Sequence, residues 1–84
     1  MQELNIHLFG ILKERVGKEK FVIEVEEQIP VRDLRPILEK ALEKLSSNFD
    51  HNLFKASALS TDEKILKSSD FIKGTKNIYI LPPV

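Results

Sequence analysis

One segment of this chain has the pattern of a long helix, and it limits the folds open to the rest. Between positions 31 and 45, apolar residues recur at three- and four-residue spacing, which is typical of an amphipathic helix. Asp33 lies where its charge favours the helix N-terminus, and Pro36 requires the regular helix to start within a few residues before it. Ser46-Ser47-Asn48 is expected to end the helix. The apolar positions are Val31, Leu34, Ile37, Leu38, Ala41, Leu42 and Leu45.

Most of the other regular segments have the pattern of strands. Residues 4–9, 21–26 and 77–81 alternate in side-chain character with a period of two, which predicts half-buried strands. Residues 11–16 predict a short helix that ends at Gly17 in a left-handed conformation. The weaker segments are a short strand at 55–60, turns at 28–30 and 68–74, an irregular connector at 49–54 and the start of an edge strand at 65–66.

One helix can cover only one face of a sheet, so this order of elements predicts an α+β fold with an open sheet face. We expect a mixed sheet of four to five strands with one main helix on one side, in a single domain spanning 1–84. Residues 77–81 are apolar on both faces, which places them at the centre of the sheet. A ferredoxin-like arrangement would need a second long helix, and the sequence has none.

Composition argues against several classes of function. Lys plus Arg equals Asp plus Glu at 13 each, and no basic stripe is present, so we expect no nucleic-acid partner. The chain has no cysteine, which excludes a thiolate zinc site and a thiol nucleophile. No signal peptide or apolar run of about 20 residues is found, which favours a cytoplasmic protein with no membrane partner.

No motif for catalysis is present either. His7 and His51 are the only histidines, and their neighbours favour a surface contact and a capping turn over metal binding. The three glycines form no phosphate-binding loop. We therefore expect no metal, no cofactor and no catalytic residue, and we favour a non-catalytic subunit over an independent enzyme.

The predicted open face carries a set of large apolar side chains, which often mark a partner surface. If the alternation holds, this face includes Phe9, Leu59, Tyr79 and Leu81 as the docking residues, with Val22 beside them. The alternative is that loops or the 49–54 connector fold over part of it. Pro82 and Pro83 favour an extended conformation, so that Pro82-Pro83-Val84 forms a stiff tail; a simple end to the strand is the other interpretation.

The order of several short motifs resembles the small subunit of molybdopterin synthase. Phe9-Gly10 followed by residues 12–17 resembles its start, and Val31-Arg32-Asp33-Leu34 resembles the opening of its helix. Ala58-Leu59-Ser60 stands where the family tends to carry Ala-Val-Asn, and the most specific match is the ending from Ile78 to Val84. Together the matches cover nearly the whole chain.

This resemblance implies a ubiquitin-like β-grasp fold and a sulfur carrier in molybdenum cofactor biosynthesis. In that family an adenylating enzyme activates the C-terminal glycine, a sulfur donor converts it to a thiocarboxylate, and the tail enters the large synthase subunit. The implied partners are that large subunit and the adenylating activator. Pro82, Pro83 and Val84 would then be the residues that enter the partner.

The sequence departs from the family at its end. The family ends in Gly-Gly, whereas no glycine follows Gly74 here, and Val84 stands two or three residues short, or roughly 6–9 Å of extended chain. Either the chain was truncated or processed, or this homologue carries no sulfur. A β-grasp interaction module without conjugation is therefore one alternative, and a thiamine-type sulfur carrier is another. The Pro-Pro ending favours the synthase type over the thiamine type.

Overall fold

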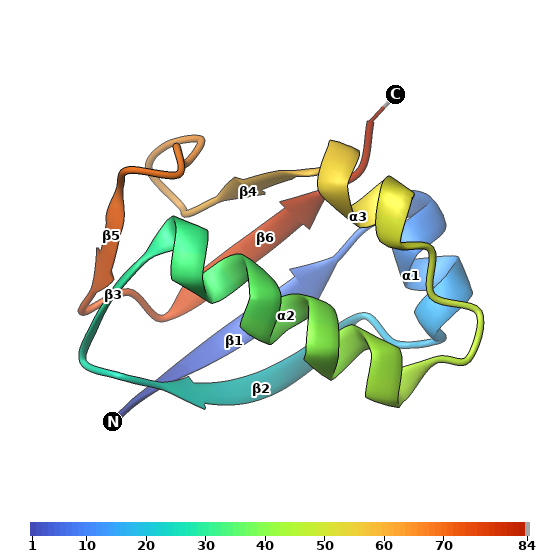
Figure 1. Ribbon diagram of the computed structural model, residues 1–84, viewed down its shortest axis with the longest axis horizontal. Coiled ribbons are helices and arrows are strands. Elements are labelled where there is room, and N and C mark those ends of the chain that lie inside the picture. Colours follow the sequence, from blue (N-terminus) through green and yellow to red (C-terminus); the bar gives the residue numbers. More distant parts are fainter. Residues whose placement is uncertain (84) are drawn as a thin grey trace.

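Six strands and three helices follow one another in the computed structural model, which describes residues 1–83. Figure 1 shows the main helix packed across one side of the larger sheet, whose opposite side carries no helix of residues 1–83. In chain order the elements are β1 (Gln2–Leu8), α1 (Gly10–Val16), β2 (Lys20–Val25), β3 (Gln28–Pro30), α2 (Val31–Leu45), α3 (His51–Ala56), β4 (Ala58–Ser60), β5 (Phe71–Lys73) and β6 (Asn77–Leu81).

The larger sheet has four strands in the order β2-β1-β6-β4, and β3 and β5 form a separate two-stranded sheet. β1 and β6 are parallel, whereas the β1–β2 and β4–β6 pairs are antiparallel. The predicted α+β class, the mixed sheet and the central position of residues 77–81 are therefore confirmed.

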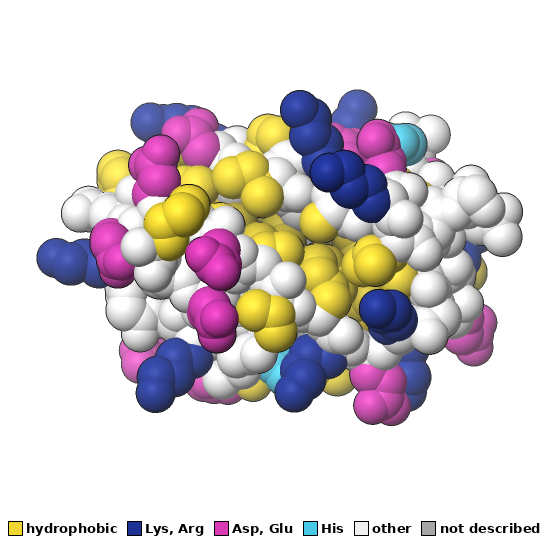
Figure 2. Space-filling view, turned by 90° about the horizontal axis from the view of Figure 1, so that it is seen from below, with side chains coloured by type: hydrophobic (Ala, Val, Ile, Leu, Met, Phe, Trp, Pro, Cys, Tyr) yellow, Lys and Arg dark blue, Asp and Glu magenta, His cyan; other side chains and the backbone are white. Residues whose placement is uncertain are grey.

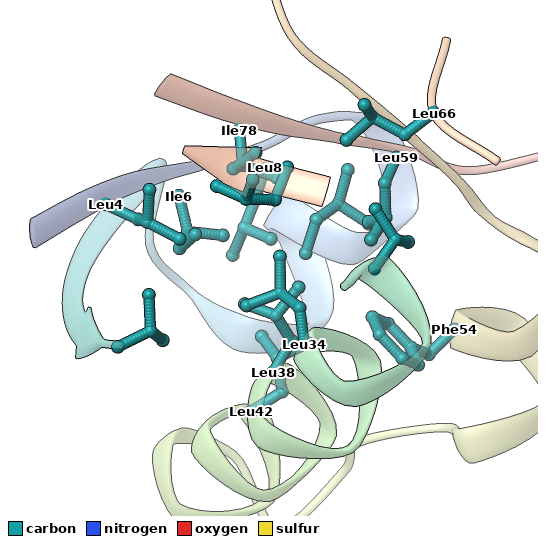
Figure 3. Close-up of a cluster of buried hydrophobic side chains, with 14 of the residues drawn as sticks. Leu4, Ile6, Leu8, Leu34, Leu38, Leu42, Phe54, Leu59, Leu66 and Ile78 are labelled. Atoms are coloured by element: carbon teal, nitrogen blue, oxygen red, sulfur yellow. The ribbon is translucent and has the colours of Figure 1, made fainter. Parts of the chain in front are cut away.

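The core lies between α2 and the inner face of this sheet (Figure 3). The alternate residues of β1 and β6 that point inward have almost no exposed surface, and so do four residues one turn apart on α2. The predicted three-and-four spacing therefore does define the buried side of the helix, except that Ile37 is exposed. The core residues of these elements are Leu4, Ile6, Leu8, Val31, Leu34, Leu38, Leu42, Ile78 and Ile80.

The start of α2 depends on the loop that precedes β5. No side chain among the described residues caps the helix, but the backbone N–H of Val31 donates to the carbonyl of Asp70 at 2.8 Å. Arg32 donates in the same way to Ser68 at 3.2 Å. These bonds satisfy two of the four N–H groups that a helix start leaves without partners.

The five weak segments differ from their predictions. Residues 28–30 are not a turn but form β3, and the predicted turn at 68–74 contains β5. The connector at 49–54 is largely helical, because the carboxylate of Asp50 accepts hydrogen bonds from the N–H groups of Asn52 and Leu53 at the start of α3. β4 is shorter than predicted, and residues 65–66 contribute only a bridge between Ile65 and Ser60.

The short helix α1 ends as predicted. Gly17 has φ +78° and donates its N–H to the carbonyl of Lys13 at 2.9 Å, so the left-handed cap is confirmed. Within residues 1–83, no helix is both long and apolar enough to cross a bilayer.

Candidate interaction surface

The open face of the sheet is defined by the residues that alternate with the core positions. Tyr79 on β6 stands at the centre of this face, paired with His7 on β1 and with Ser60 on β4. Leu81, two residues further along β6, pairs with Ala58. All five side chains are partly exposed, because α2 lies on the other side of the sheet.

An aromatic row crosses this face. The rings of His7 and Tyr79 stack with their centroids 4.7 Å apart, and the ring of Phe9 lies 6.0 Å from that of Tyr79. His7 Nε2 is 2.9 Å from Oδ1 of Asn77, and the Tyr79 hydroxyl donates to the carboxylate of Asp62. That hydrogen bond raises the pKa of Tyr79, because the phenolate would lose it and face a negative carboxylate. The row is thus anchored by polar contacts, while Phe9 remains 43% exposed.

The prediction that placed Leu59 on the open face is wrong. Leu59 has 0% exposure and pairs with Ile80 on the core side of the sheet. The predicted strand at 55–60 would have turned Ala56 and Ala58 inward, but α3 runs to Ala56 and β4 starts at Ala58. Because neighbouring side chains alternate between faces, a shift by one residue exchanges the two sides. The structure buries the larger leucine, and Ala58 takes its place beside Leu81.

The three remaining predicted docking residues do share one area. Phe9 directly follows Leu8, whose partner on β6 is Ile80, so Phe9 continues the open face at the level of Leu81. Phe9, Tyr79 and Leu81 are called the docking patch below. Val22 is 52% exposed on the same face, but it lies on β2 and pairs with Asn5, away from the patch.

The C-terminal tail leaves the body next to this patch. Leu81 ends β6, and Pro82 follows it immediately. A methyl group added to Gly10 would lie only 3.3 Å from Cγ of Pro82, and Gly10 has φ +55°, so the tail passes closely over the start of α1. Figure 1 shows the chain leaving there, beyond α1 and α3. Pro82 is half-buried and Pro83 exposed; Val84, the last predicted tail residue, lies outside the described residues.

A shallow hollow of about 280 Å³ borders the patch on the side of α1. Its lining includes His7, Phe9 and Gly10, together with Lys13 and Glu19, whose side chains form an ion pair at 2.8 Å. The hydrogen bond from Lys13 lowers the pKa of Glu19. An apolar ring beside a pair of opposite charges can receive a side chain of a partner protein.

His51 bonds to α2 and holds two helices together. Its Nδ1 is 2.7 Å from Oε2 of Glu39, and its Nε2 is 2.9 Å from Oε1 of Glu43, so α3 is tied to α2. Asp50 caps α3, as the sequence suggested for this turn. In the part of the chain that the structure describes, no three His, Cys, Asp or Glu side chains are grouped to hold a metal ion.

Comparison with known proteins rests on structure alone. No family model matches this sequence, and no curated protein matches it. The small archaeal modifier protein 1 of Haloferax volcanii has 20% sequence identity and a TM-score of 0.75, with each chain fully covered.

Two further structures come from proteins whose descriptions name molybdopterin. The Pyrococcus furiosus protein that is named as molybdopterin converting factor subunit 1 has 19% identity and a TM-score of 0.74, with both chains fully covered. The complex of subunits 1 and 2 of the molybdopterin-converting factor from Helicobacter pylori matches with 21% identity and a TM-score of 0.66, over 99% of this chain and 96% of the other. These likenesses show a ubiquitin-like β-grasp fold, and they confirm the resemblance drawn from the sequence at the level of the fold.

Proposed function

We propose that this chain is a small subunit of the sulfur-carrier type, which binds a larger enzyme through the docking patch and presents its C-terminal tail to that enzyme. The observation that carries the proposal is the continuity of patch and tail. Leu81 belongs to the patch, and the next residue, Pro82, lies against Gly10, the neighbour of Phe9. A partner that covers the patch therefore receives the tail at a defined position and direction.

The large subunit of molybdopterin synthase is the partner we propose, with an adenylating activator as the second. Two observations support this choice: the Helicobacter pylori protein of the same fold is described as a complex of subunits 1 and 2, and residues 78–84 resemble the end of the synthase small subunit. Both partners would use the same patch, because each has to receive the same tail.

The patch has the properties of an interface centre. Its side chains project from the central strand β6 and from the end of the neighbouring strand β1. Little conformational entropy is therefore lost when a partner orders them. Aromatic residues near the centre of an interface are enriched among hot spots, whose truncation costs about 2 kcal/mol or more. That corresponds to a rise of about thirtyfold in the dissociation constant.

The test is calorimetric titration of the large synthase subunit from the same source with three variants. Phe9→Glu and Leu81→Glu should each raise the dissociation constant by at least about thirtyfold, because a carboxylate would be buried against an apolar surface. Phe71→Glu is the matched control, since Phe71 is 55% exposed but lies on β5, outside the patch. Unchanged affinity in both patch variants, with circular dichroism showing folded protein, would reject the docking patch.

A second experiment separates a sulfur carrier from an interaction module that uses the same patch. The gene is sequenced beyond the codon for Val84. A continuation to Ser, Thr or Cys followed by Gly-Gly supports the carrier. A native stop codon there supports the module without sulfur chemistry.

A further inference from the structure

The strand β2 forms one edge of the four-stranded sheet, and no other strand of residues 1–83 pairs with its outer side (Figure 1). The N–H of Leu8 donates to the carbonyl of Glu19 at 2.8 Å. Since hydrogen-bonded pairs alternate along an antiparallel ladder, every second residue of β2 bonds to β1. The backbone groups of Lys20, Val22 and Glu24 therefore point outward from the sheet.

The core beneath this edge is incompletely covered. Phe21 and Ile23 point toward α2, yet both stay half-exposed, whereas the inward residues of β1 from Leu4 onward and those of β6 are buried. A shallow groove of about 460 Å³ runs between β2 and α2, and Leu45 and Ala41 line its helix side. Figure 2 views the molecule from the side of β2, and hydrophobic side chains gather in the middle of that view.

We propose that β2 pairs with β2 of a second copy of this chain, antiparallel and centred on Val22, so that two sheets join into one. The sequence of this edge is complementary to itself in that arrangement. Lys20 stands opposite Glu24 of the other copy, and Lys18 opposite Glu26, each pair occurring twice by symmetry. Val22 meets its own counterpart on the open face. On the helix side, Phe21 meets Ile23 of the other copy, which covers the exposed part of both grooves.

The charges within one copy favour such a partner. Among residues 1–83, the side chains of Lys18, Lys20, Glu24 and Glu26 form no ion pair. In its own sheet Glu24 pairs with Glu3, and like charges directly opposite each other are unfavourable. A lysine from the second copy supplies the missing positive charge.

Other pairings of the same edge lose this match. A parallel arrangement in register would place Lys20 opposite Lys20 and Glu24 opposite Glu24. An antiparallel arrangement shifted by two residues would place Val22 opposite a charged residue. Centring on Val22 also forms about six backbone hydrogen bonds between the copies, because three residues of each copy have outward-pointing groups.

The other sheet edge does not compete, and the proposed dimer leaves the tail free. β4 has only three residues, and its outer side is occupied at Ser60 by the bridge to Ile65. In Figure 1 the tail leaves the molecule on the side opposite β2. The dimer is therefore independent of the proposed partner enzyme and would persist if that proposal failed.

Sedimentation equilibrium at low ionic strength tests the charge pairing. Lys20→Glu alone and Glu24→Lys alone should each raise the dimer dissociation constant by about tenfold or more, since each reverses one partner in two symmetric pairs. The double variant restores opposite charges across the interface and should return to within about threefold of the original value. A chain that is monomeric at about 1 mM, or a double variant as weak as the singles, overturns the proposal.

Cysteine crosslinking tests the register. The chain has no cysteine of its own, so Val22→Cys introduces a single thiol that meets its counterpart across the two-fold axis at about 5.5 Å between Cα atoms, within disulfide reach. Glu24→Cys is the matched control on the same edge, because in this register it faces Lys20 and not itself. Rapid disulfide dimerisation of Val22→Cys only is expected. Equal rates for the two variants would contradict a dimer centred on Val22.

Discussion

Leu59 and Leu81 provide a direct test of how β4 is oriented, because they lie on neighbouring strands but on opposite sides of the sheet. Leu59 is fully buried in the core, whereas Leu81 is half-exposed in the docking patch. The test replaces each leucine with alanine, and the two variants remove the same three carbon atoms from the two environments. Leu59→Ala should reduce stability strongly, and Leu81→Ala should mainly reduce partner binding.

The magnitude follows from burial. Truncation of a fully buried leucine loses its transfer free energy and leaves a cavity, which together cost about 3–5 kcal/mol. In a chain of 84 residues, a loss of about 3 kcal/mol lowers Tm by roughly 12–24 °C. Leu81 buries only part of its side chain, so Leu81→Ala should cost about 0.5–1 kcal/mol.

Urea unfolding followed by far-ultraviolet circular dichroism measures both values, since the chain contains no tryptophan. The slope of the unfolding free energy against urea should be the same in both variants, because it reflects the surface exposed on unfolding. A cost below about 1 kcal/mol for Leu59→Ala, or equal costs for the two variants, would show that the orientation of β4 is wrong.

Three further perturbations test other parts of the structure. Gly10→Ala should lower the unfolding free energy by about 1–2 kcal/mol, measured by urea unfolding, because φ is +55° and the tail lies close; a gain in stability would contradict that geometry. Asp62→Ala should lower the pKa of Tyr79 toward its ordinary value. Because Tyr79 is the only tyrosine, near-ultraviolet absorbance against pH measures this pKa directly, and an unchanged titration curve would show that the hydrogen bond to Asp62 does not form. The N–H of Lys67 donates to the Asp70 carboxylate and lowers its pKa, so this group stabilises the fold above the ordinary carboxyl pKa and loses that effect as pH falls through the lowered value. Asp70→Asn should therefore flatten the fall of the urea midpoint between about pH 4 and pH 2, and an equally steep fall would exclude this contribution.

The long periodic segments could be predicted because one side of each is buried. Ile78 and Ile80 alternate with Tyr79 and Leu81 over a whole strand, so the two faces of β6 follow from its sequence. The docking patch followed from the same alternation in β1 and β6. The spacing on α2 was equally informative, because four buried positions recur over its length.

The short segments could not be predicted in this way. β4 has three residues, too few for alternation to define its faces, and the start of the strand decides whether Ala58 or Leu59 points inward. One local signal was available: Asp50 is a good N-cap, and a helix starting there moves the strand toward the C-terminus. Within the described part of the chain β3 and β5 pair only with each other, and no pattern in three residues reveals a partner more than 40 positions away in the sequence.

The parallel pairing of β1 with β6 determines how this molecule would respond to mechanical force. The chain enters β1 at one end of the sheet and leaves β6 at the other end (Figure 1). Tension between the N-terminus and the tail therefore slides the two strands along each other, which loads all the hydrogen bonds between them at once instead of opening them one after another. A force applied between these two ends is therefore resisted by the whole β1–β6 ladder.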